Sequence, residues 1–399
     1  MYVVHVVRQF YPGVGGLENH VLDLARAQVA AGDRIRVVTL DRLFKDEAQE
    51  RLAATEMLDG IEIVRIPFSG SQRYPLALSV LRHLDGADIV HVHAIDFFFD
   101  FLGWTRPLHR HKLVATTHGG FFHTNYAARL KRVWFSTITR LSSMFYDAIV
   151  ACSTSDYERF RTVCPGRVRL IEDGVNTSKF HDAAAKQFQK SLIAIGRFSQ
   201  NKRVDLLLRF AEALAAKDPD WRLTIAGRPD DLRIADIDAL IRSAGLESSV
   251  RVVDSPSDAE LKQLMADSSF LASASDYEGF GMTSIEGMSA GLFPVLSDIP
   301  PFRSLVARTG LGLILDFNDS EAAANTLLQR AADMASYYGE QRRACMTAAE
   351  AYDWAHISAE IGALYETILG IGMASSDEAA PTQPFDEASG SRQASLGKH

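Results

Sequence analysis

The sequence predicts an α/β protein with two Rossmann-like domains, each a doubly wound parallel sheet, that face one another across a cleft. Short β-branched runs alternate with helical patterns along most of the 399 residues. Strands buried on both faces and separated by helices form parallel sheets. A chain of this length also exceeds one ordinary core and suits two domains of about 150 to 200 residues each.

The strands are expected in two series. The first series is Val3–Val7, Arg36–Leu40, Glu62–Ile66, Ile89–His93, Leu113–Thr117, Ala148–Cys152 and Val168–Ile171. The second series is Leu192–Ile195, Arg222–Ala226, Val250–Val253, Phe270–Ala272, Phe293–Leu296 and Gly312–Leu315. A helix over Leu17–Ala31 follows the first strand and ends at Gly32.

A polar linker, Lys179–Lys190, separates the two series. We therefore expect an N-terminal domain over 1–180 and a C-terminal domain over 191–350. A C-terminal helix over 351–373 is expected to pack back on the first domain. The polar tail over 374–399 has few large apolar residues and is expected to be disordered.

Composition excludes several classes of protein. The formal net charge of −8 argues against a nucleic-acid binder, which needs a dominant basic surface. Cys152, Cys164 and Cys345 match no metal or redox spacing and are expected to be packing residues. The N-terminus is typical of a strand and not of a signal peptide, and no apolar run reaches the roughly 18 residues of a spanning helix. These features favour a cytoplasmic protein.

The first strand leads into a glycine-rich loop, RQFYPGVGGLENHV, with Gly15 and Gly16 just before a helix. Backbone N–H groups at a helix N-terminus favour anions, and glycine lets a ligand approach closely. The spacing is not GxGxxG, so a dinucleotide-dependent dehydrogenase is excluded. A tight turn without a ligand remains an alternative for this loop.

The second series begins with a basic loop, GRFSQNKRVD, which places Arg197 and Lys202 at the carboxyl end of a strand and before a helix near Val204. Arginine offers forked donors to phosphate, and lysine offers a mobile point charge. The two could neutralise a diphosphate leaving group as its charge develops. Two solvated surface cations are the alternative.

The segment YEGFGMTSIEG combines a glycine-rich turn with a helix predicted over Met282–Met288. Backbone N–H groups of Gly281, Met282 and Thr283 would meet a phosphate. Carboxylates near phosphates need neutral hydroxyl donors, such as those of a sugar or a ribose. The alternative is that Glu278 is an acidic residue favoured by the helix dipole at the N-terminus, and that Glu286 is an ordinary surface residue.

Together these motifs resemble retaining glycosyltransferases of the GT-B fold, family four. The resemblance spans nearly the whole ordered chain through GVGG, THGGFFH, DGVN, GRFSQNK and EGFGMTSIE, whose glutamate pair encloses seven residues. Two departures occur: Asp173 stands where the family usually has asparagine, and Leu292–Phe293 replaces a short polar pair. Neither departure affects the expected charge-neutralising groups.

The resemblance assigns roles within a nucleotide-sugar site. Glu278 would bind sugar hydroxyls, Glu286 the ribose, and His118 would lie beside the transferred sugar. The implied catalytic residues are His118, Glu278, Arg197 and Lys202. The implied donor-binding residues are Gly15, Gly16, Arg197, Lys202, Asp254, Glu278, Gly281, Met282, Thr283 and Glu286.

The implied reaction transfers a hexose with retention at the anomeric carbon, through an oxocarbenium-like transition state. A front-face route, in which the leaving phosphate helps to deprotonate the acceptor, fits the absence of a clear carboxylate nucleophile in the sequence. No cofactor and no metal ion are expected, because the sequence has no DxD-like cluster placed to hold one.

The donor base is indicated by Asp254 in RVVDSPSD, at the expected carboxyl end of a strand. A carboxylate accepts two hydrogen bonds from guanine N1–H and N2–H₂, whereas uracil offers one donor. This favours a GDP-sugar, with GDP-mannose as the donor that the resemblance suggests. A turn residue before Pro256 is nearly as good an interpretation.

The acceptor is indicated by a basic and aromatic segment in the N-terminal domain. The predicted membrane and acceptor residues are Arg129, Lys131, Arg132, Trp134 and Phe135. Such a helix can lie on anionic lipid. With the resemblance to mannosyltransferases of exopolysaccharide assembly, it suggests a polyprenyl-diphosphate-linked saccharide acceptor and peripheral association with the inner face of the cell membrane. A solvated face over an ordinary core is the alternative.

Three other functions compete with this interpretation of the sequence. A family-four transferase could use a UDP-sugar on another lipid or saccharide. A nucleotide-sugar epimerase would need acid and base carboxylates that are not evident outside the glutamate pair. A non-catalytic nucleotide-sugar-binding protein would be expected to have lost Arg197, Lys202 or the glutamates, and all four are present.

Overall fold

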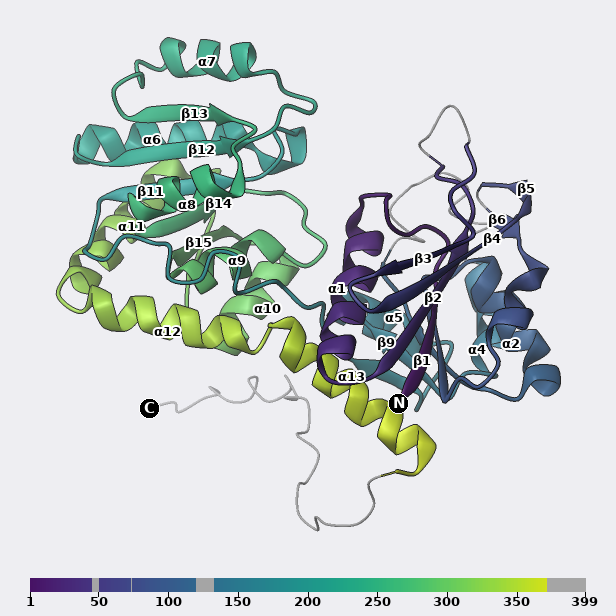
Figure 1. Cartoon of the computed structure of the whole chain (residues 1–399). Coiled ribbons are helices and arrows are strands. Elements are labelled where there is room, and N and C mark those ends of the chain that lie inside the picture. The colour runs from purple at the N-terminus through teal and green to yellow at the C-terminus, as the bar shows by residue number, and fades with distance from the viewer. Residues whose placement is uncertain (45–49, 73, 120–132, 372–399) are drawn as a thin grey trace, which may run out of the picture.

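The structure is a computed structural model, and it describes residues 1–44, 50–72, 74–119 and 133–371. The predicted tail and the predicted lipid-binding residues Arg129, Lys131 and Arg132 lie outside these residues. Figure 1 shows the strands of the two halves in separate sheets, with helices packed around each. The predicted pair of parallel α/β sheets is confirmed.

The first sheet has eight strands in the described residues, in the order β10-β9-β8-β7-β1-β2-β4-β3. Neighbouring strands are parallel except β3 and β4, which are antiparallel. β2 and β7 flank β1 on opposite sides, which creates a topological switch point, where open α/β sheets bind ligands. The strands are β1 (Tyr2–Val6), β2 (Arg34–Leu40), β3 (Thr55–Leu58), β4 (Ile61–Ile66), β7 (Ile89–His93), β8 (Lys112–Thr116), β9 (Ala148–Ala151) and β10 (Val168–Leu170).

The second sheet has six strands, all parallel, in the order β13-β12-β11-β14-β15-β16 over the same described ranges. Its switch point lies between β11 and β14, because successive strands run outward on either side of that pair. The strands are β11 (Ser191–Ile195), β12 (Arg222–Gly227), β13 (Val250–Asp254), β14 (Phe270–Ser273), β15 (Phe293–Ser297) and β16 (Leu313–Leu315).

Helices cover both sheets. Those of the first half are α1 (Gly16–Ala30), α2 (Phe97–His109), α4 (Arg140–Ser143) and α5 (Thr154–Arg161), with the shorter turns η1 (Leu78–His83) and η2 (Phe135–Thr139). Those of the second half are η3 (Gln200–Lys202), α6 (Val204–Lys217), α7 (Ile234–Ser243), α8 (Asp258–Ala266), α9 (Met282–Ala290), α10 (Pro300–Thr309), α11 (Ser320–Ala335), α12 (Tyr338–Glu350) and α13 (Trp354–Leu369).

Strand β1 shows why the first half folds as a two-faced sheet. Its side chains alternate between layers: Val3 joins one buried cluster, while Val4 and Val6 join the other. The first of these clusters also contains Trp354 and Tyr365, so α13 packs on the first sheet although it follows the second in sequence. Figure 1 shows α13 alongside α1. The domain boundaries stay a prediction.

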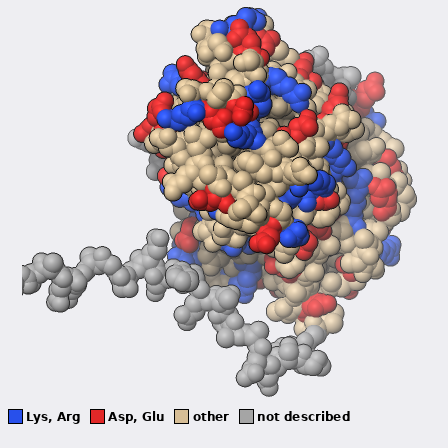
Figure 2. All heavy atoms as spheres, turned by 90° about the vertical axis from the view of Figure 1, so that its left-hand side faces the viewer, with Lys and Arg blue, Asp and Glu red and all other residues tan. Residues whose placement is uncertain are grey.

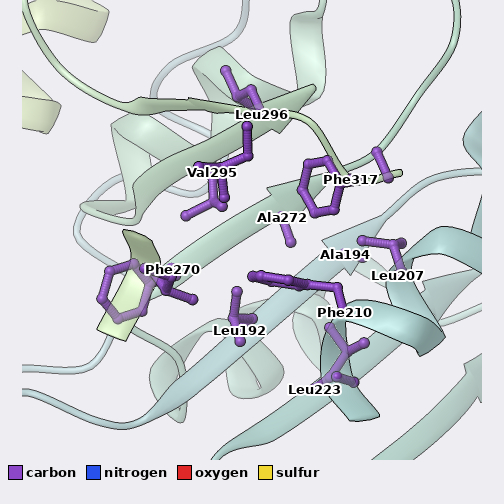
Figure 3. Close-up of a cluster of buried hydrophobic side chains, with 14 of the residues drawn as sticks. Leu192, Ala194, Leu207, Phe210, Leu223, Phe270, Ala272, Val295, Leu296 and Phe317 are labelled. Carbon is purple, nitrogen blue, oxygen red and sulfur yellow. The ribbon is translucent and has the colours of Figure 1, made fainter. Parts of the chain in front are cut away.

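The second core is built around aromatic side chains. Figure 3 shows Phe210 of α6 among Leu192 and Leu223 from the strands, with Phe317 nearby. The rings of Phe210 and Phe317 meet edge to face, with centroids 5.1 Å apart. The three cysteines are free and buried, as expected for packing residues.

The strands of both predicted series are present, with ends that differ by at most two residues. The sequence did not predict β3 or the hairpin of β5 (Ser69–Ser71) and β6 (Tyr74–Leu76). These short strands lie at or beyond the sheet edge and are partly exposed, so they lack the buried β-branched runs that marked the others.

The surface charge is mixed where Figure 2 displays it. On that face, basic and acidic side chains are interspersed and neither sign forms a broad patch, consistent with the exclusion of a nucleic-acid binder. Among the helices of the described residues, none combines the length and the apolar character needed to cross a bilayer.

We predict that Phe210→Ala lowers the free energy of unfolding by about 3 to 5 kcal/mol, because it leaves a cavity in the second core. Urea denaturation measures this change. The matched control, Leu240→Ala, alters an apolar side chain that is 43% exposed, and a shift within about 0.5 kcal/mol is expected. Equal losses in both variants would contradict the packing described for Phe210.

Candidate active site

The two loops at the second switch point are bonded to each other. The Asp276 N–H donates to the Asn201 carbonyl at 2.9 Å, and the Asn201 side-chain amide donates to the Tyr277 carbonyl at 3.2 Å. Arg203 donates to both carboxylate oxygens of Asp276 at 3.1 Å. The loop after β11 and the loop after β14 therefore form one surface at the carboxyl edge of the sheet.

Lys202 and Glu278 meet across these loops. Lys202 Nζ lies 2.5 Å from Glu278 Oε1, which also accepts a 2.7 Å hydrogen bond from Ser275. The side chains are only 21% and 17% exposed. Both line a small cavity with Gly281 and Thr283. The structure thus brings together four of the residues predicted from sequence, and shows the cation and the carboxylate neutralising one another.

Arg197 has a different partner. Its guanidinium donates to Asp230 at 2.6 Å, and its side chain is 56% exposed. Asp231 accepts from the Gln200 N–H at 3.2 Å. The Asp230–Asp231 pair thus holds the basic loop. Because Arg197 is solvated and long, it can exchange Asp230 for a phosphate at little cost.

The N-terminus of α9 presents free backbone donors. Gly281 is its N-cap residue in the left-handed region, with φ of 86°, and a Cβ there would lie 2.9 Å from the Phe302 ring. Both constraints require glycine. The N–H groups of Met282 and Thr283 have no acceptor within the described residues. This arrangement suits an anion beside Lys202.

Glu286 lies within α9 and is partly buried. Its carboxylate accepts no hydrogen bond from the residues that the structure describes. Burial raises its pKa, Lys179 opposes that rise, and Asp258 adds to it. Asp258 begins α8, so the start of that helix lies near Glu286. A partly buried carboxylate without donors is suited to accept from a pair of ligand hydroxyls.

Asp254 ends β13 and is exposed. Its carboxylate accepts from the Ser255 hydroxyl at 2.7 Å, and Ser255 has a φ of 44°. Asp254 therefore sits in a tight turn and is also accessible from the carboxyl edge, and both interpretations from sequence stay open. It is paired with Gly227 and lies two strands from β11.

His118 follows β8 at the carboxyl edge of the first sheet. Its φ of 51° is rare for a residue with a side chain and is typical of functional sites. Asp156 holds this turn, since its Oδ2 accepts from the Thr117 hydroxyl at 2.6 Å and from the Gly119 N–H at 2.9 Å. Burial lowers the pKa of His118 well below its usual range. The neutral ring offers one donor and one acceptor.

The glycine loop lies at the start of α1, after β1. Gly15 is the N-cap residue in an extended conformation, and neither it nor Gly16 has a positive φ. A Cβ at Gly16 would meet nothing within 4 Å among the described atoms. A Cβ at Gly15 would lie too close to Glu18 Oε2, so contact with that side chain favours glycine there, while the open space at Gly16 is compatible with a ligand. No described contact links them to Lys202.

A cavity of about 320 Å³ lies between the two sheets. Ser153 and Thr154 from the first half face Glu278, Tyr277 and Phe280 from the second across it. Most of the remaining lining is apolar, from the Ile299–Pro301 segment and its neighbours. The carboxyl edges of the sheets therefore approach one another beside Glu278.

Sequence reasoning missed several side chains that organise this region, including Asp156, Asn201 and a set of buried histidines. Three groups of described residues place possible metal-ligand atoms within 4.8 Å of one another. They are His5, His91 and His93; His20, His93 and His118; and His118, Cys152 and Asp173. Both ring nitrogens of His5, His91 and His93 already form hydrogen bonds, so a cation in the first group would break them.

The predicted lipid-facing segment requires one correction. Phe135 is 7% exposed and packs against Phe160 in the first core, so the expectation that it contacts a membrane is wrong. The aromatic and basic pattern did not reveal which side of the turn faced inward. Trp134 is partly buried against Tyr74, with ring centroids 6.1 Å apart.

Two sheets meet at a cleft, with a basic loop and a free helix N-terminus at the second switch point, and this arrangement suits a phosphate-bearing ligand. Two family models match the chain: Glycosyltransferase Family 4 over residues 14–179 and Glycosyl transferases group 1 over residues 176–351. The protein is a glycosyltransferase of the GT-B fold, and it belongs to the glycosyltransferases that these two models together describe.

The curated relatives narrow the family further. The chain is 43% identical to the GDP-mannose:cellobiosyl-diphosphopolyprenol alpha-mannosyltransferase of Komagataeibacter xylinus, over 95% of this chain and 96% of that protein. It is also 43% identical to the Xanthomonas campestris protein of the same name, over 93% and 98% of the two chains. The chain belongs to the family of these mannosyltransferases.

Solved structures show the same fold at lower identity. A glycosyltransferase from Rickettsia africae has a TM-score of 0.69 and 17% identity, over 92% of this chain and 98% of that one. Anabaena HepE, solved in complex with UDP, has a TM-score of 0.69 and 18% identity, over 92% and 100%.

We predict that Lys202→Met lowers kcat/KM for glycosyl transfer about 10² to 10³-fold, the usual effect of removing one donor that stabilises developing negative charge. Steady-state kinetics measures the loss. Lys217→Met is the matched control, since Lys217 pairs with Glu321 at the end of α6 and its removal should leave kcat/KM unchanged. Near-normal turnover of the Lys202 variant, with its fold intact by circular dichroism, would contradict the role of Lys202.

We predict that donor affinity falls on acidification at a higher pH than an ordinary glutamate would produce. Burial raises the pKa of Glu286, so its protonated form persists to higher pH and loses an acceptor for the ribose. Glu286→Gln should weaken donor binding at neutral pH, and donor affinity in this variant should no longer fall on acidification in that pH range (the acidic limb of the profile). Calorimetric titration of the donor across pH measures both effects, and an unchanged limb in the variant would exclude Glu286 as its origin.

Proposed function

We propose that the protein transfers mannose from GDP-mannose to a polyprenyl-diphosphate-linked oligosaccharide, with retention, in exopolysaccharide biosynthesis. The observation that carries the proposal is the 43% identity to the relatives of that name along nearly their whole length. The donor would bind at the second switch point, and the first domain would present the acceptor.

Guanine recognition is supported by the position of Asp254. Neighbouring strands are about 4.8 Å apart, so Asp254 on β13, two strand spacings from β11, lies roughly 10 Å from the β11 edge. A nucleoside diphosphate lying along this edge would place its phosphates near Lys202 and its base near Asp254. Glu286 lies close enough to Asp258, at the start of α8, for the two charges to interact, and we propose that Glu286 binds the ribose between phosphates and base.

The proposed chemistry uses positive groups that the chain itself supplies. The bond from the anomeric carbon to the diphosphate breaks, and the acceptor oxygen bonds to the same face of that carbon. The acceptor proton passes to the leaving diphosphate. Lys202, Arg197 and the α9 N-terminus would neutralise the charge that develops on this group. Because these groups supply positive charge, we propose that transfer needs no metal ion.

The proposed membrane contact is supported by exposed apolar side chains on α2, on α4 and at the residue that follows α4, which form one set because α4 packs against α2. Trp104, Leu108, Leu141 and Met144 are 44% to 78% exposed. Arg110, Lys112 and Arg140 are exposed nearby. Apolar side chains flanked by cations suit the surface of an anionic bilayer, where a polyprenyl-linked acceptor resides. We propose peripheral association with its cytoplasmic face.

We predict selective use of GDP-mannose when the purified protein is offered GDP-mannose, GDP-fucose, UDP-glucose and UDP-N-acetylglucosamine with cellobiosyl-diphosphopolyprenol. Sugar incorporation into lipid is measured with and without EDTA, which should make no difference. Preference for a UDP-sugar would overturn the guanine assignment and the proposed donor. Loss of turnover in EDTA that added Mg²⁺ or Mn²⁺ restores would overturn metal independence.

We predict that Leu108→Glu weakens binding to vesicles containing phosphatidylglycerol, because it places an acid among apolar and basic side chains. Cosedimentation at low salt measures binding. Leu240→Glu is the control, since Leu240 is the same residue type and is also exposed, at 43% against 78% for Leu108, but lies on α7. Equal binding by both variants would remove α2 from the membrane contact.

A further inference from the structure

A line of buried side chains leads away from His118. His118 Nε2 lies 3.1 Å from His93 Nδ1, and His93 Nε2 lies 2.9 Å from His5 Nδ1. His5 Nε2 lies 2.6 Å from Gln28 Oε1. His5, His93 and Gln28 are at most 1% exposed. His118 lies in the turn after β8, and the other three residues lie on β7, β1 and α1, so the sheet and its covering helix together build the line.

The strand register explains how the histidines meet. His91 and His93 lie on the same face of β7, because side chains alternate along a strand. β1 is parallel to β7, with His5 paired to His91. His5 therefore points to the same face, within reach of His93. Sequence alone offers the HVH repeat as a signal, but not the strand order that brings His5 beside it.

Hydrogen bonding along this line has a direction. A neutral imidazole has one N–H and one lone pair. The Gln28 oxygen faces His5, so His5 Nε2 must carry a proton and its Nδ1 must accept. His93 Nε2 then donates to His5, and His93 Nδ1 accepts from His118 Nε2. Each ring is thereby fixed as the Nε2–H tautomer.

One observation supports the neutral state of the rings, and a second supports the orientation of the Gln28 amide. Burial lowers the pKa of His5 to about 4 and that of His93 and His118 well below the usual range, so the rings are neutral near pH 7. The Gln28 amide nitrogen lies 3.5 Å from the Tyr365 hydroxyl, which lies 2.6 Å from His91 Nδ1. Tyr365 can accept from Gln28 while donating to His91, which satisfies the amide in this orientation.

We propose that Gln28, His5 and His93 are positioning residues that hold His118 in the Nε2–H tautomer, so that its Nδ1 lone pair is available to accept a hydrogen bond from a hydroxyl of the transferred sugar. The role of the sugar rests on the proposed function; the tautomer does not. His118 Nδ1 has no partner among the described residues. The turn held by Asp156 keeps the ring at the sheet edge.

Nitrogen NMR of histidine side chains tests the tautomer directly. Protein labelled with ¹⁵N-histidine gives long-range proton–nitrogen correlations that distinguish protonated from unprotonated ring nitrogens, and His118→Asn assigns the His118 signals. The wild type should show protonated Nε2 and unprotonated Nδ1 on His118. The opposite tautomer in the wild type would overturn the proposal.

Variants test the line as a unit. Gln28→Met and His5→Leu remove the fixed acceptor, so His118 should populate both tautomers and kcat should fall about 2- to 10-fold, as expected for one neutral hydrogen bond. His5→Gln is the conservative counterpart: its amide oxygen can accept from His93 while its nitrogen donates to Gln28. It should restore the wild-type tautomer and most of kcat.

The outcomes separate this proposal from the proposed function. If the tautomer of His118 is unchanged in both Gln28→Met and His5→Leu, with each variant folded by thermal denaturation, the line does not set it. If the tautomer shifts as expected but GDP-mannose is not the donor, the positioning role stands and the proposed donor fails. A shifted tautomer with unchanged kcat would exclude the lone pair from sugar binding.

Discussion

The candidate active site depends on the ion pair between Lys202 and Glu278. The pair joins the loops that follow β11 and β14, the two strands that flank the second switch point. Both side chains are largely shielded, so the attraction is stronger than that of a surface pair, and each charge would be costly to leave alone. The site is thus held in shape by the two groups that we propose contact the nucleotide sugar.

Donor binding would exchange these partners. A diphosphate approaching Lys202 would take over the cation, and Glu278 would then be free to accept from sugar hydroxyls. The same substitution holds for Arg197, whose present partner is Asp230. The helix N-terminus of α9 needs no exchange, since its first N–H groups are unpaired in the described chain. The positive charge is therefore present before the donor arrives, and only its partners change.

In the first sheet, hydrogen bonds rather than ion pairs fix the position of the candidate site residue His118. Asp156 holds the strained turn at His118 from one side, and buried histidines contact the ring from behind. Buried polar groups are costly unless each is hydrogen-bonded. The line from His118 to Gln28 meets that requirement with neutral rings only. It therefore leaves His118 little freedom to change its tautomer.

Much of the fold followed from sequence because its strands are buried on both faces and read as β-branched runs such as YVVHV. The edge strand β3 and the β5–β6 hairpin did not, since partly exposed edges carry no such pattern. Phe135 was misassigned because an aromatic in a basic segment suits a membrane surface and a protein core equally well. The proposed donor residues were predicted from local motifs, whereas Asp156 and His5 act through contacts between distant strands, which no local motif reveals.

If the Lys202–Glu278 pair opens to receive a diphosphate, a crystal structure of the protein with GDP will show it. We expect phosphate oxygens within about 3 Å of Lys202 Nζ and of the N–H groups that begin α9, with Glu278 released from Lys202. GDP bound with its phosphates elsewhere, and Lys202 still bonded to Glu278, would contradict this expectation.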